Sequence, residues 1–226
     1  SVLFYLFPLP DNTSVGTLLV AVASGVLRTT AFTIMLYAFK RDEVSRVVPV
    51  VFTYPIFVAL MAVLLLGESL DYLEWLAIII VVAGAVMISG RKSSSGTTIW
   101  QVKPFLILFS SSLLFALTDI TSKYVLAYIS SGSLLWLGGF CISGIFLMVS
   151  VRPCLIKQLV ELKQKSLVMV LIVSCEILAL VGVWLLLWAI ERGPVSLISA
   201  ITGSRPIFVF MNVLILNRVL PVFLDW

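Results

Sequence analysis

Four charged side chains fall inside apolar stretches of this chain, and they are its first candidates for chemistry: Arg28, Asp119, Glu176 and Arg205. A charge near the centre of a lipid bilayer costs roughly 2.5 to 3.5 kcal/mol on insertion scales, so each needs a charged partner, a water-filled cavity or both. We therefore predict that these residues bind substrate or couple an ion, with an internal structural ion pair as the alternative.

Asp119 and Lys123 lie four residues apart and therefore share one face of a helix. Side chains at this spacing pair readily, so a local structural ion pair is the simpler interpretation. A role in ion coupling is the alternative for both residues.

Tyr54 and Arg205 each stand directly before a proline in an apolar stretch, Pro55 and Pro206. A proline in a helix interior removes one hydrogen bond and bends the axis, so helix kinks are predicted at both sites. Such bends leave backbone groups free to line a cavity, to which the Tyr54 phenol and the Arg205 guanidinium would add. A guanidinium binds carboxylate or phosphate groups through two hydrogen bonds, which suits an anionic or zwitterionic substrate. Purely structural kinks are the alternative.

Other residues have simpler explanations. Three aromatic residues either line the same cavity or anchor helix ends at the membrane surface: Trp184, Trp188 and Tyr37. Three acidic residues between two apolar stretches are expected to form a solvated turn: Glu68, Asp71 and Glu74. Small residues three to five apart predict a face for close helix packing: Gly138, Gly139, Ser143 and Gly144.

Several kinds of chemistry lack their usual residues. The chain has no histidine, and its three cysteines (Cys141, Cys154 and Cys175) form no metal-binding spacing, so we expect no metal, no cofactor and no enzymatic activity. The cysteines are interpreted as small packing residues. No phosphate-binding loop of the GxxxxGK[ST] type occurs, which leaves a gradient as the driving force for any transport.

The composition places these residues in a membrane protein. Of the 226 residues 61% are hydrophobic and 12% are charged, and the mean hydropathy is +1.18, which exceeds what one soluble domain can bury. Long apolar stretches in lipid satisfy their backbone hydrogen bonds as helices, so the class is all-α, a polytopic membrane helix bundle in contact with the lipid bilayer. The net charge of +4 comes mostly from basic residues between the stretches, which predicts no nucleic-acid partner.

One segment of the chain occurs twice. Residues 38 to 58 and 189 to 209 agree at eight of 21 positions at an offset of 151, including a matched Arg, a matched Ser and the run Pro-Ile-Phe-Val. Apolar composition alone does not align such residues, so two structural repeats are predicted. The Gly/Ser-rich basic linker at residues 90 to 98 separates a first repeat at residues 1 to 92 from a second at residues 99 to 226.

The apolar stretches predict seven complete membrane spans and part of an eighth, and we expect both ends of the chain to be truncated. The complete spans include residues 14 to 38, 47 to 67, 166 to 190 and 195 to 216. Basic residues gather on one alternate set of loops, which the positive-inside rule places in the cytoplasm: residues 40 to 46, 91 to 103, 152 to 165 and 218.

Six residues occur in the order and at the spacing of a known family pattern: Ala38, Ser45, Pro55, Glu68, Trp75 and Gly84. In these residues the chain resembles the EamA-like family of the drug/metabolite transporter superfamily. The resemblance implies ten helices in two inverted five-helix repeats around a central cavity, of which this chain would hold the end of helix 2 through helix 9. It also implies cytoplasmic termini, which would place the linker at 91 to 103 outside, opposite to the charge bias.

The chain departs from the family pattern at two places. Ala77 stands where the family often has a glycine, and Asn217-Arg218 replaces Gly67-Glu68 in the second repeat, so a symmetric role for the acidic turn is in doubt.

Repeat symmetry relates two of the buried charges. At the offset of 151, Arg28 corresponds to Ala179 and Glu176 to Gly25, so each charge lies within one helical turn of the other's symmetry position. The hypothesis is that Arg28 and Glu176 pair across the pseudo-twofold axis, and that substrate or a proton breaks this pair during transport.

The resemblance implies a secondary transporter, a permease that moves a small organic metabolite across the plasma or inner membrane by alternating access, with efflux and uptake both open. The alternatives are a nucleotide-sugar or phosphate-ester exchanger and a membrane-embedded lipid flippase or enzyme. A channel is disfavoured because no filter-like loop or ring of charges occurs. A homodimer is left open. The predicted substrate-binding residues are Arg205, Tyr54, Arg28, Glu176 and Trp184.

Overall fold

The computed structural model describes residues 7–10, 13–40, 47, 51, 53–89, 102–150 and 165–205, together with residues 207, 208, 211, 212, 215 and 218. Every regular element among these residues is a helix, which confirms the all-α class. The predicted boundary between the repeats, at residues 90 to 98, lies outside the described residues, and so does Pro206. The division of the chain into two repeats therefore stays a prediction.

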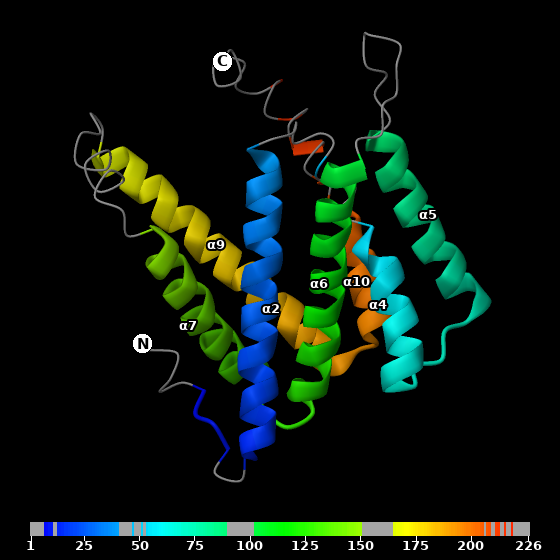
Figure 1. The fold of residues 1–226 in the computed structure, drawn as a ribbon, viewed down its shortest axis with the longest axis horizontal. Coiled ribbons are helices and arrows are strands. Elements are labelled where there is room, and N and C mark those ends of the chain that lie inside the picture. Colours follow the sequence, from blue (N-terminus) through cyan, green and yellow to red (C-terminus); the bar gives the residue numbers. More distant parts are fainter. Residues whose placement is uncertain are drawn as a thin grey trace. The chain divides into compact units, whose positions relative to one another are not determined.

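The helices follow the apolar stretches of the sequence (Figure 1). They are α2 (Val15–Phe39), α4 (Tyr54–Met61), the π-helical turn η1 (Ala62–Leu66), α5 (Tyr72–Ser89), α6 (Val102–Leu126), α7 (Ser131–Ser150), α9 (Lys165–Arg192) and α10 (Val195–Gly203). Three of the described helices are long and apolar enough, by length and composition, to cross a membrane, at Val15–Phe39, Ser131–Met148 and Val168–Arg192.

Two of the predicted spans are interrupted by turns. The span expected over residues 47 to 67 contains a turn at Thr53, directly before α4, and the span expected over residues 195 to 216 contains a turn at Ser204, directly after α10. Each turn stands two residues before a proline, Pro55 or Pro206. A proline has no backbone N–H, so a helix tolerates it best at its first residues, where the N–H has no partner within the helix; α4 begins in this way, with Pro55 as its second residue.

The chain forms two compact units. The first combines Ser1–Thr29 with Thr121–Gly193, and the second combines Thr30–Ile120 with Pro194–Trp226. Each unit therefore takes segments from both sides of the predicted repeat boundary. Helices α2 and α6 each contribute one part to the first unit and one part to the second.

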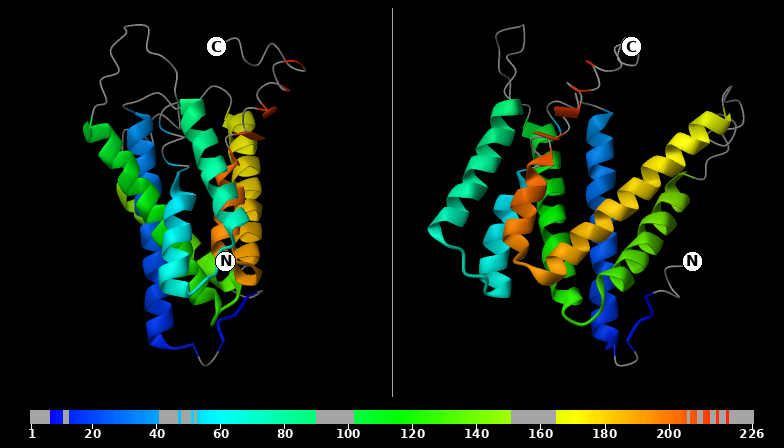
Figure 2. Two further views of the ribbon diagram at one scale, coloured as in Figure 1. Left: turned by 90° about the vertical axis from the view of Figure 1, so that its right-hand side faces the viewer. Right: turned by 180° about the vertical axis from the view of Figure 1, so that it is seen from behind.

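In the first unit, α7 and α9 lie side by side (Figure 2). The first part of α2 packs on α7 at Gly25, where an added Cβ would lie 3.0 Å from the Cβ of Cys141 and 3.3 Å from the Cα of Gly138. This contact favours a glycine, because a Cβ at this distance would be tighter than nine in ten real Cβ contacts and its neighbours would have to give by a few tenths of an ångström. The backbone of Gly138 and the side chain of Cys141 thus form the contact of α7 with Gly25. An added Cβ at Gly138, Gly139 or Gly144 would itself meet no atom within 4 Å.

In the second unit, α10 packs beside α4 and α5 (Figure 2). Ala59 of α4, Ile78 of α5 and Ala200 of α10 form a buried apolar cluster, with Leu70 and Trp75 packed against it. The small alanine side chains let the helix backbones approach closely. The position of α10 is therefore set by contacts with helices from the first part of the sequence.

The buried part of α6 in this unit also carries small polar side chains. Ser111 donates a hydrogen bond of 3.0 Å to the carbonyl of Ala31 on α2, and Ser112 donates one of 3.2 Å to the carbonyl of Val51. Both serines are fully buried. Short hydroxyl side chains of this kind join helices where lipid offers no hydrogen-bonding groups.

Candidate functional site

The candidate site is built on a stripe of three hydroxyl-bearing residues on α10, in the second unit. Ser196, Ser199 and Thr202 follow one another at intervals of three residues, so their hydroxyl groups project from neighbouring positions on one side of the helix. Ser196 and Ser199 are fully buried. Each of the three hydroxyl groups is hydrogen-bonded to a different element of this unit.

Ser199 binds the buried carboxylate of Asp119. Its hydroxyl group donates a hydrogen bond of 3.1 Å to Oδ2 of Asp119 on α6, and the exposed fractions are 1% for Ser199 and 6% for Asp119. A carboxylate in an apolar helical environment is costly to keep ionised, and a hydroxyl donor lowers that cost. Asp119, one of the predicted charged residues, therefore lies in a polar contact between two helices.

Tyr54 extends this contact to α4. Its hydroxyl group is hydrogen-bonded to the hydroxyl of Thr202, and that threonine in turn donates a hydrogen bond of 2.9 Å to the carbonyl of Ser199. Because the only hydroxyl proton of Thr202 is used in this way, Tyr54 is the donor of the first bond. We call the connected residues Asp119, Ser199, Thr202 and Tyr54 the polar chain. It links α4, α6 and α10.

Aromatic rings pack beside the polar chain. The ring centroid of Phe115 lies 6.2 Å from that of Tyr54 and 5.1 Å from that of Phe32, the second pair in an edge-to-face arrangement. Phe115 precedes Asp119 by four residues, so both side chains lie on the same face of α6. The polar chain is therefore bordered by apolar ring surface.

The helix breaks before the two prolines give Tyr54 and Arg205 equivalent positions. Thr53 has φ −78° and ψ −5°, and Ser204 has φ −79° and ψ −2°. In each case the residue three positions later donates a backbone hydrogen bond to its carbonyl, at 3.2 Å from Ile56 and 2.9 Å from Ile207. Tyr54 is buried against α10, whereas Arg205 is exposed.

The acidic turn is not merely solvated, as the sequence suggested. The carboxylate of Glu68 accepts hydrogen bonds from the backbone N–H groups of Val195 and Ser196 and from the hydroxyl of Ser196, all at the start of α10. Glu74 behaves differently, because it accepts a hydrogen bond of 2.9 Å from the N–H of Asp71, at the start of its own helix. Glu68 thus belongs to the surroundings of the site.

Lys123 binds the backbone where α9 ends. In the first unit its ammonium group donates hydrogen bonds of 2.7 Å to the carbonyl of Ile190 and 2.9 Å to that of Gly193, at the C-terminal end of α9. A cation at this end of a helix is favourable because the last carbonyls are unpaired within the helix and carry partial negative charge. The predicted ion pair of Lys123 with Asp119 stays a prediction.

The remaining candidates lie in several places. Arg28 is half-buried on α2, and Glu176 is exposed on α9. Trp184 is half-buried on α9, and its indole N–H is one of two buried side-chain polar atoms without a hydrogen-bond partner among the described residues. Trp188 stacks with the guanidinium of Arg192, 4.3 Å from the ring centroid. The predicted pairing of Arg28 with Glu176 stays a prediction.

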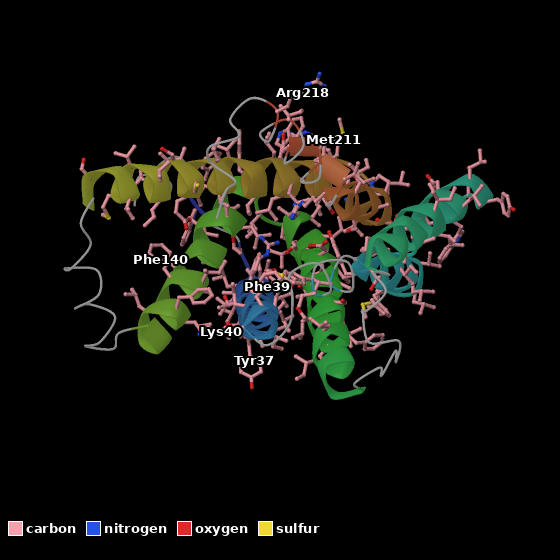
Figure 3. All side chains as sticks on the ribbon, turned by 90° about the horizontal axis from the view of Figure 1, so that it is seen from above. Tyr37, Phe39, Lys40, Phe140, Met211 and Arg218 are labelled. Atoms are coloured by element: carbon pink, nitrogen blue, oxygen red, sulfur yellow. The ribbon has the colours of Figure 1, made fainter. Side chains whose placement is uncertain are left out.

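Tyr37 lies near the end of α2 and points outward (Figure 3). Its side chain is 44% exposed, which fits the role of an anchor at the membrane surface better than that of a cavity residue.

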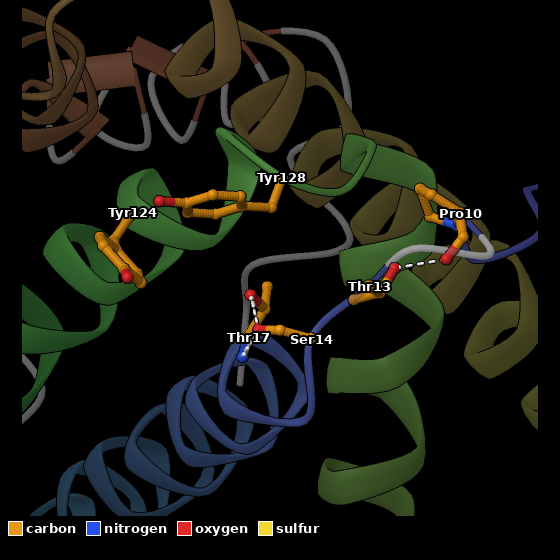
Figure 4. A pocket seen from close by; sticks show the side chains of 6 residues that line it. All are labelled: Pro10, Thr13, Ser14, Thr17, Tyr124 and Tyr128. Carbon is orange, nitrogen blue, oxygen red and sulfur yellow. Dashed lines mark hydrogen bonds between the residues drawn. The ribbon is translucent and has the colours of Figure 1, made fainter.

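An open pocket of about 350 Å³ lies in the first unit, between the start of α2 and the end of α6 (Figure 4). It is lined by hydroxyl-bearing and aromatic residues: Pro10, Thr13, Ser14, Thr17, Tyr124 and Tyr128. Ser14 accepts a hydrogen bond from the N–H of Thr17 and caps α2, and Thr13 bonds to the carbonyl of Pro10. The hydroxyl groups of Ser14 and Thr13 are therefore used to stabilise the start of α2 and the turn before it. We do not include this pocket in the candidate site.

No group of three or more His, Cys, Asp or Glu side chains comes together in the part of the chain that the structure describes.

Sequence reasoning missed Ser196, Ser199 and Thr202. The available signal was their spacing of three residues within a stretch that is otherwise apolar. Serine and threonine are common in membrane helices as small packing residues, so the spacing alone does not predict a buried carboxylate opposite them.

Comparison with known proteins identifies one family. Residues 1–90 match the model of the EamA-like transporter family. No curated protein and no solved structure matches the chain.

Proposed function

Since residues 1–90 of this chain belong to the EamA-like transporter family, part of the drug/metabolite transporter superfamily, we propose that the protein is a secondary transporter that moves a small organic metabolite by alternating access. The three long apolar helices support the assignment to an integral membrane protein. Alternating access needs a polar site between helices that can change partners. The polar chain is the feature that best meets this need.

The observation that carries the proposal is the buried carboxylate of Asp119 with its hydroxyl donor on another helix. A charge in an apolar helical environment is costly, so a buried acidic residue that is kept there with a polar partner on another helix is a candidate for a functional role. A hydroxyl group can donate to the ionised carboxylate and accept from the protonated one. Asp119 is therefore the residue we assign to coupling between substrate movement and a proton gradient.

Transport by the full-length protein in liposomes tests this proposal. Labelled amino acids, sugars, polyamines and nucleotide-sugars are offered with and without an imposed pH gradient. We expect one class to accumulate only with the gradient, and Asp119→Asn to reduce its accumulation to the level without a gradient. Asp71→Asn, which changes a carboxylate in an exposed turn, is the matched control and should transport like the wild type.

Two results would contradict the proposal. If no compound of the panel moves although the protein is folded, the transporter assignment loses its support and a flippase or enzyme becomes the better explanation. If Asp119→Asn accumulates substrate with the pH dependence of the wild type, Asp119 has no part in coupling.

Arg205 is the candidate for binding an anionic group of the substrate. It lies at the end of α10 next to Ser204 and is exposed, so a ligand can reach it without displacing a packed side chain. A guanidinium binds a carboxylate with two hydrogen bonds in a fixed geometry that an ammonium cannot reproduce. Arg205→Lys should therefore raise KM almost as much as Arg205→Ala, with little effect on the maximal rate. Equal KM values for both variants and the wild type would exclude this role.

Arg28 and Glu176 remain a second possible coupling pair. Both belong to the first unit, so their pairing does not depend on the polar chain. Glu176→Gln removes the charge with little change in shape. Loss of pH-dependent uptake in this variant supports the pair, and unchanged uptake with unchanged pH dependence excludes it.

A further inference from the structure

Helix α10 begins without a capping side chain of its own. Pro194 occupies the position before its first residue and offers no side-chain acceptor to the free N–H groups of the first turn. Glu68 supplies this acceptor from the turn between η1 and α5. Its Oε1 accepts a bond of 2.8 Å from the N–H of Val195, and its Oε2 accepts bonds of 3.3 Å and 2.6 Å from the N–H and the hydroxyl of Ser196.

The backbone that presents Glu68 has a specific geometry. Gly67 has φ +67°, a left-handed conformation that glycine adopts without strain, and it ends the π-helical turn. The N–H groups of Gly67 and Glu68 then both bond to the carbonyl of Ala62, the second at 3.2 Å, which satisfies a free carbonyl at this helix end. This turn fixes the direction of the Glu68 side chain relative to the end of α4 and η1.

The charge of Glu68 suits its position. The start of a helix carries partial positive charge, so a carboxylate that accepts its N–H groups is stabilised by both the bonds and the dipole. Ser196 is fully buried, which limits competition from water for these bonds. The contact is therefore a firm attachment between the end of η1 and the start of α10.

We propose that Glu68 is a positioning residue for the transport site, which acts by holding the first turn of α10. Ser199 and Thr202 lie one and two turns further along the stripe that begins at Ser196, at about 4.5 Å and 9 Å along the helix axis. Rotation or translation of the first turn therefore moves both hydroxyl groups away from Asp119 and Tyr54. The link to transport rests on the proposed function, whereas the attachment of α10 does not.

Hydrogen exchange measured by mass spectrometry tests the attachment without any transport assay. In the full-length protein, Glu68→Ala should raise the exchange rate of a peptide covering residues 195 to 199 about tenfold, since it removes the acceptors of two amide groups. Glu68→Gln should give an intermediate rate, because it keeps one acceptor oxygen and loses the charge. Glu74→Ala is the matched control and should leave this peptide unchanged.

The attachment is refuted if this peptide exchanges at the wild-type rate in Glu68→Ala. It is also refuted if Glu74→Ala raises the exchange rate of the peptide as much as Glu68→Ala does. If Glu68→Ala does not fold, the comparison is made with Glu68→Gln and Ser196→Ala, which each remove part of the contact. A faster rate in both supports the attachment, and an unchanged rate in both refutes it.

A double substitution tests the positioning role. If Glu68 acts through Ser199, Glu68→Ala and Ser199→Ala should each reduce gradient-driven uptake, and the double variant should be no worse than Ser199→Ala alone. If the double variant instead shows the product of the two single reductions in uptake, Glu68 acts by another route, and the positioning role is overturned. If even the wild type transports nothing, the proposed function fails and this role fails with it, while the exchange result still decides whether Glu68 holds α10.

Discussion

The hydroxyl groups of Ser196, Ser199 and Thr202 are carried on short side chains, so each reaches only the element directly opposite it. The strength of a hydrogen bond falls steeply when its distance or angle departs from the optimum. A movement of α10 by one or two ångströms therefore breaks these contacts without requiring any large side chain to repack. This property suits a site that has to change partners during a transport cycle.

Tyr54→Phe tests the end of the polar chain. The variant keeps the ring that packs on Phe115 and removes only the hydroxyl group bonded to Thr202. We expect a loss of about 1 kcal/mol in the free energy of unfolding, the usual contribution of one hydrogen bond. Chemical unfolding in detergent measures it, with Tyr72→Phe as the control because Tyr72 is 80% exposed. If both variants change the free energy of unfolding equally, the hydrogen bond to Thr202 does not contribute to stability.

Lys123→Met tests the cation at the end of α9. The variant removes two hydrogen bonds to the carbonyls of Ile190 and Gly193 and leaves a side chain of similar length. Bonds to a charged group contribute more than neutral ones, so we expect a loss of about 2 kcal/mol and a lower Tm. Lys123→Arg keeps the charge and should retain part of the stability. If Lys123→Met has the Tm of the wild type, the cation does not stabilise this helix end.

At the scale of helices, the first unit depends on a close approach between α2 and α7. Hydrophobic surface gives no driving force for helix association in lipid, so packing has to come from close contact between backbones. Gly25 allows that contact with Gly138 and Cys141. Glycine in a helix interior lowers helix stability, and here the packing compensates for that loss.

Gly25→Ala should therefore destabilise the protein, although alanine is the better helix former. The added Cβ would lie 3.0 Å from the Cβ of Cys141, so the contact between α2 and α7 has to give by a few tenths of an ångström. Gly144→Ala makes the same change on α7 where no atom lies within 4 Å, and it should be neutral or stabilising by up to about 1 kcal/mol. Thermal unfolding of both variants measures the difference. Equal Tm values would show that the crossing tolerates a methyl group.

At the scale of the whole molecule, each compact unit combines segments that are far apart in the sequence. In the second unit, α4 and α5 pack on α10, and Glu68 binds the start of that helix. The predicted first repeat therefore has surfaces that only the later part of the chain covers.

Separating the chain in its Gly/Ser-rich linker tests this dependence. Residues 1 to 92 expressed alone should aggregate or be degraded, because the apolar cluster of Ala59 and Ile78 lacks Ala200. Co-expression with residues 93 to 226 should restore a monodisperse complex in size-exclusion chromatography. A first fragment that is monodisperse alone, at the yield of the complex, would show that the repeat folds independently.

Features that depend on composition and local order could be predicted from the amino-acid sequence. The high hydropathy and long apolar stretches predicted an all-α membrane protein, because in lipid a helix is the simplest way to satisfy the backbone. The motif residues indicated the EamA-like family, and residues 1–90, which contain all six of them, match the model of that family. Asp119 and Tyr54 could be selected as candidates because a charge, or a residue before a proline, is conspicuous in an apolar stretch.

Which of these residues contact one another became known from the packing of the helices. Ser199 and Thr202 are ordinary residues in the sequence, and their importance comes from Asp119 and Tyr54 lying opposite them on other helices. Glu68 was interpreted as part of a solvated turn because its partner, the uncapped start of α10, lies 127 residues further along the chain. Helix stripes and turns are local properties that a sequence pattern can reveal. Which stripe faces which turn depends on the packing of distant segments, and a single sequence does not encode that in any local pattern.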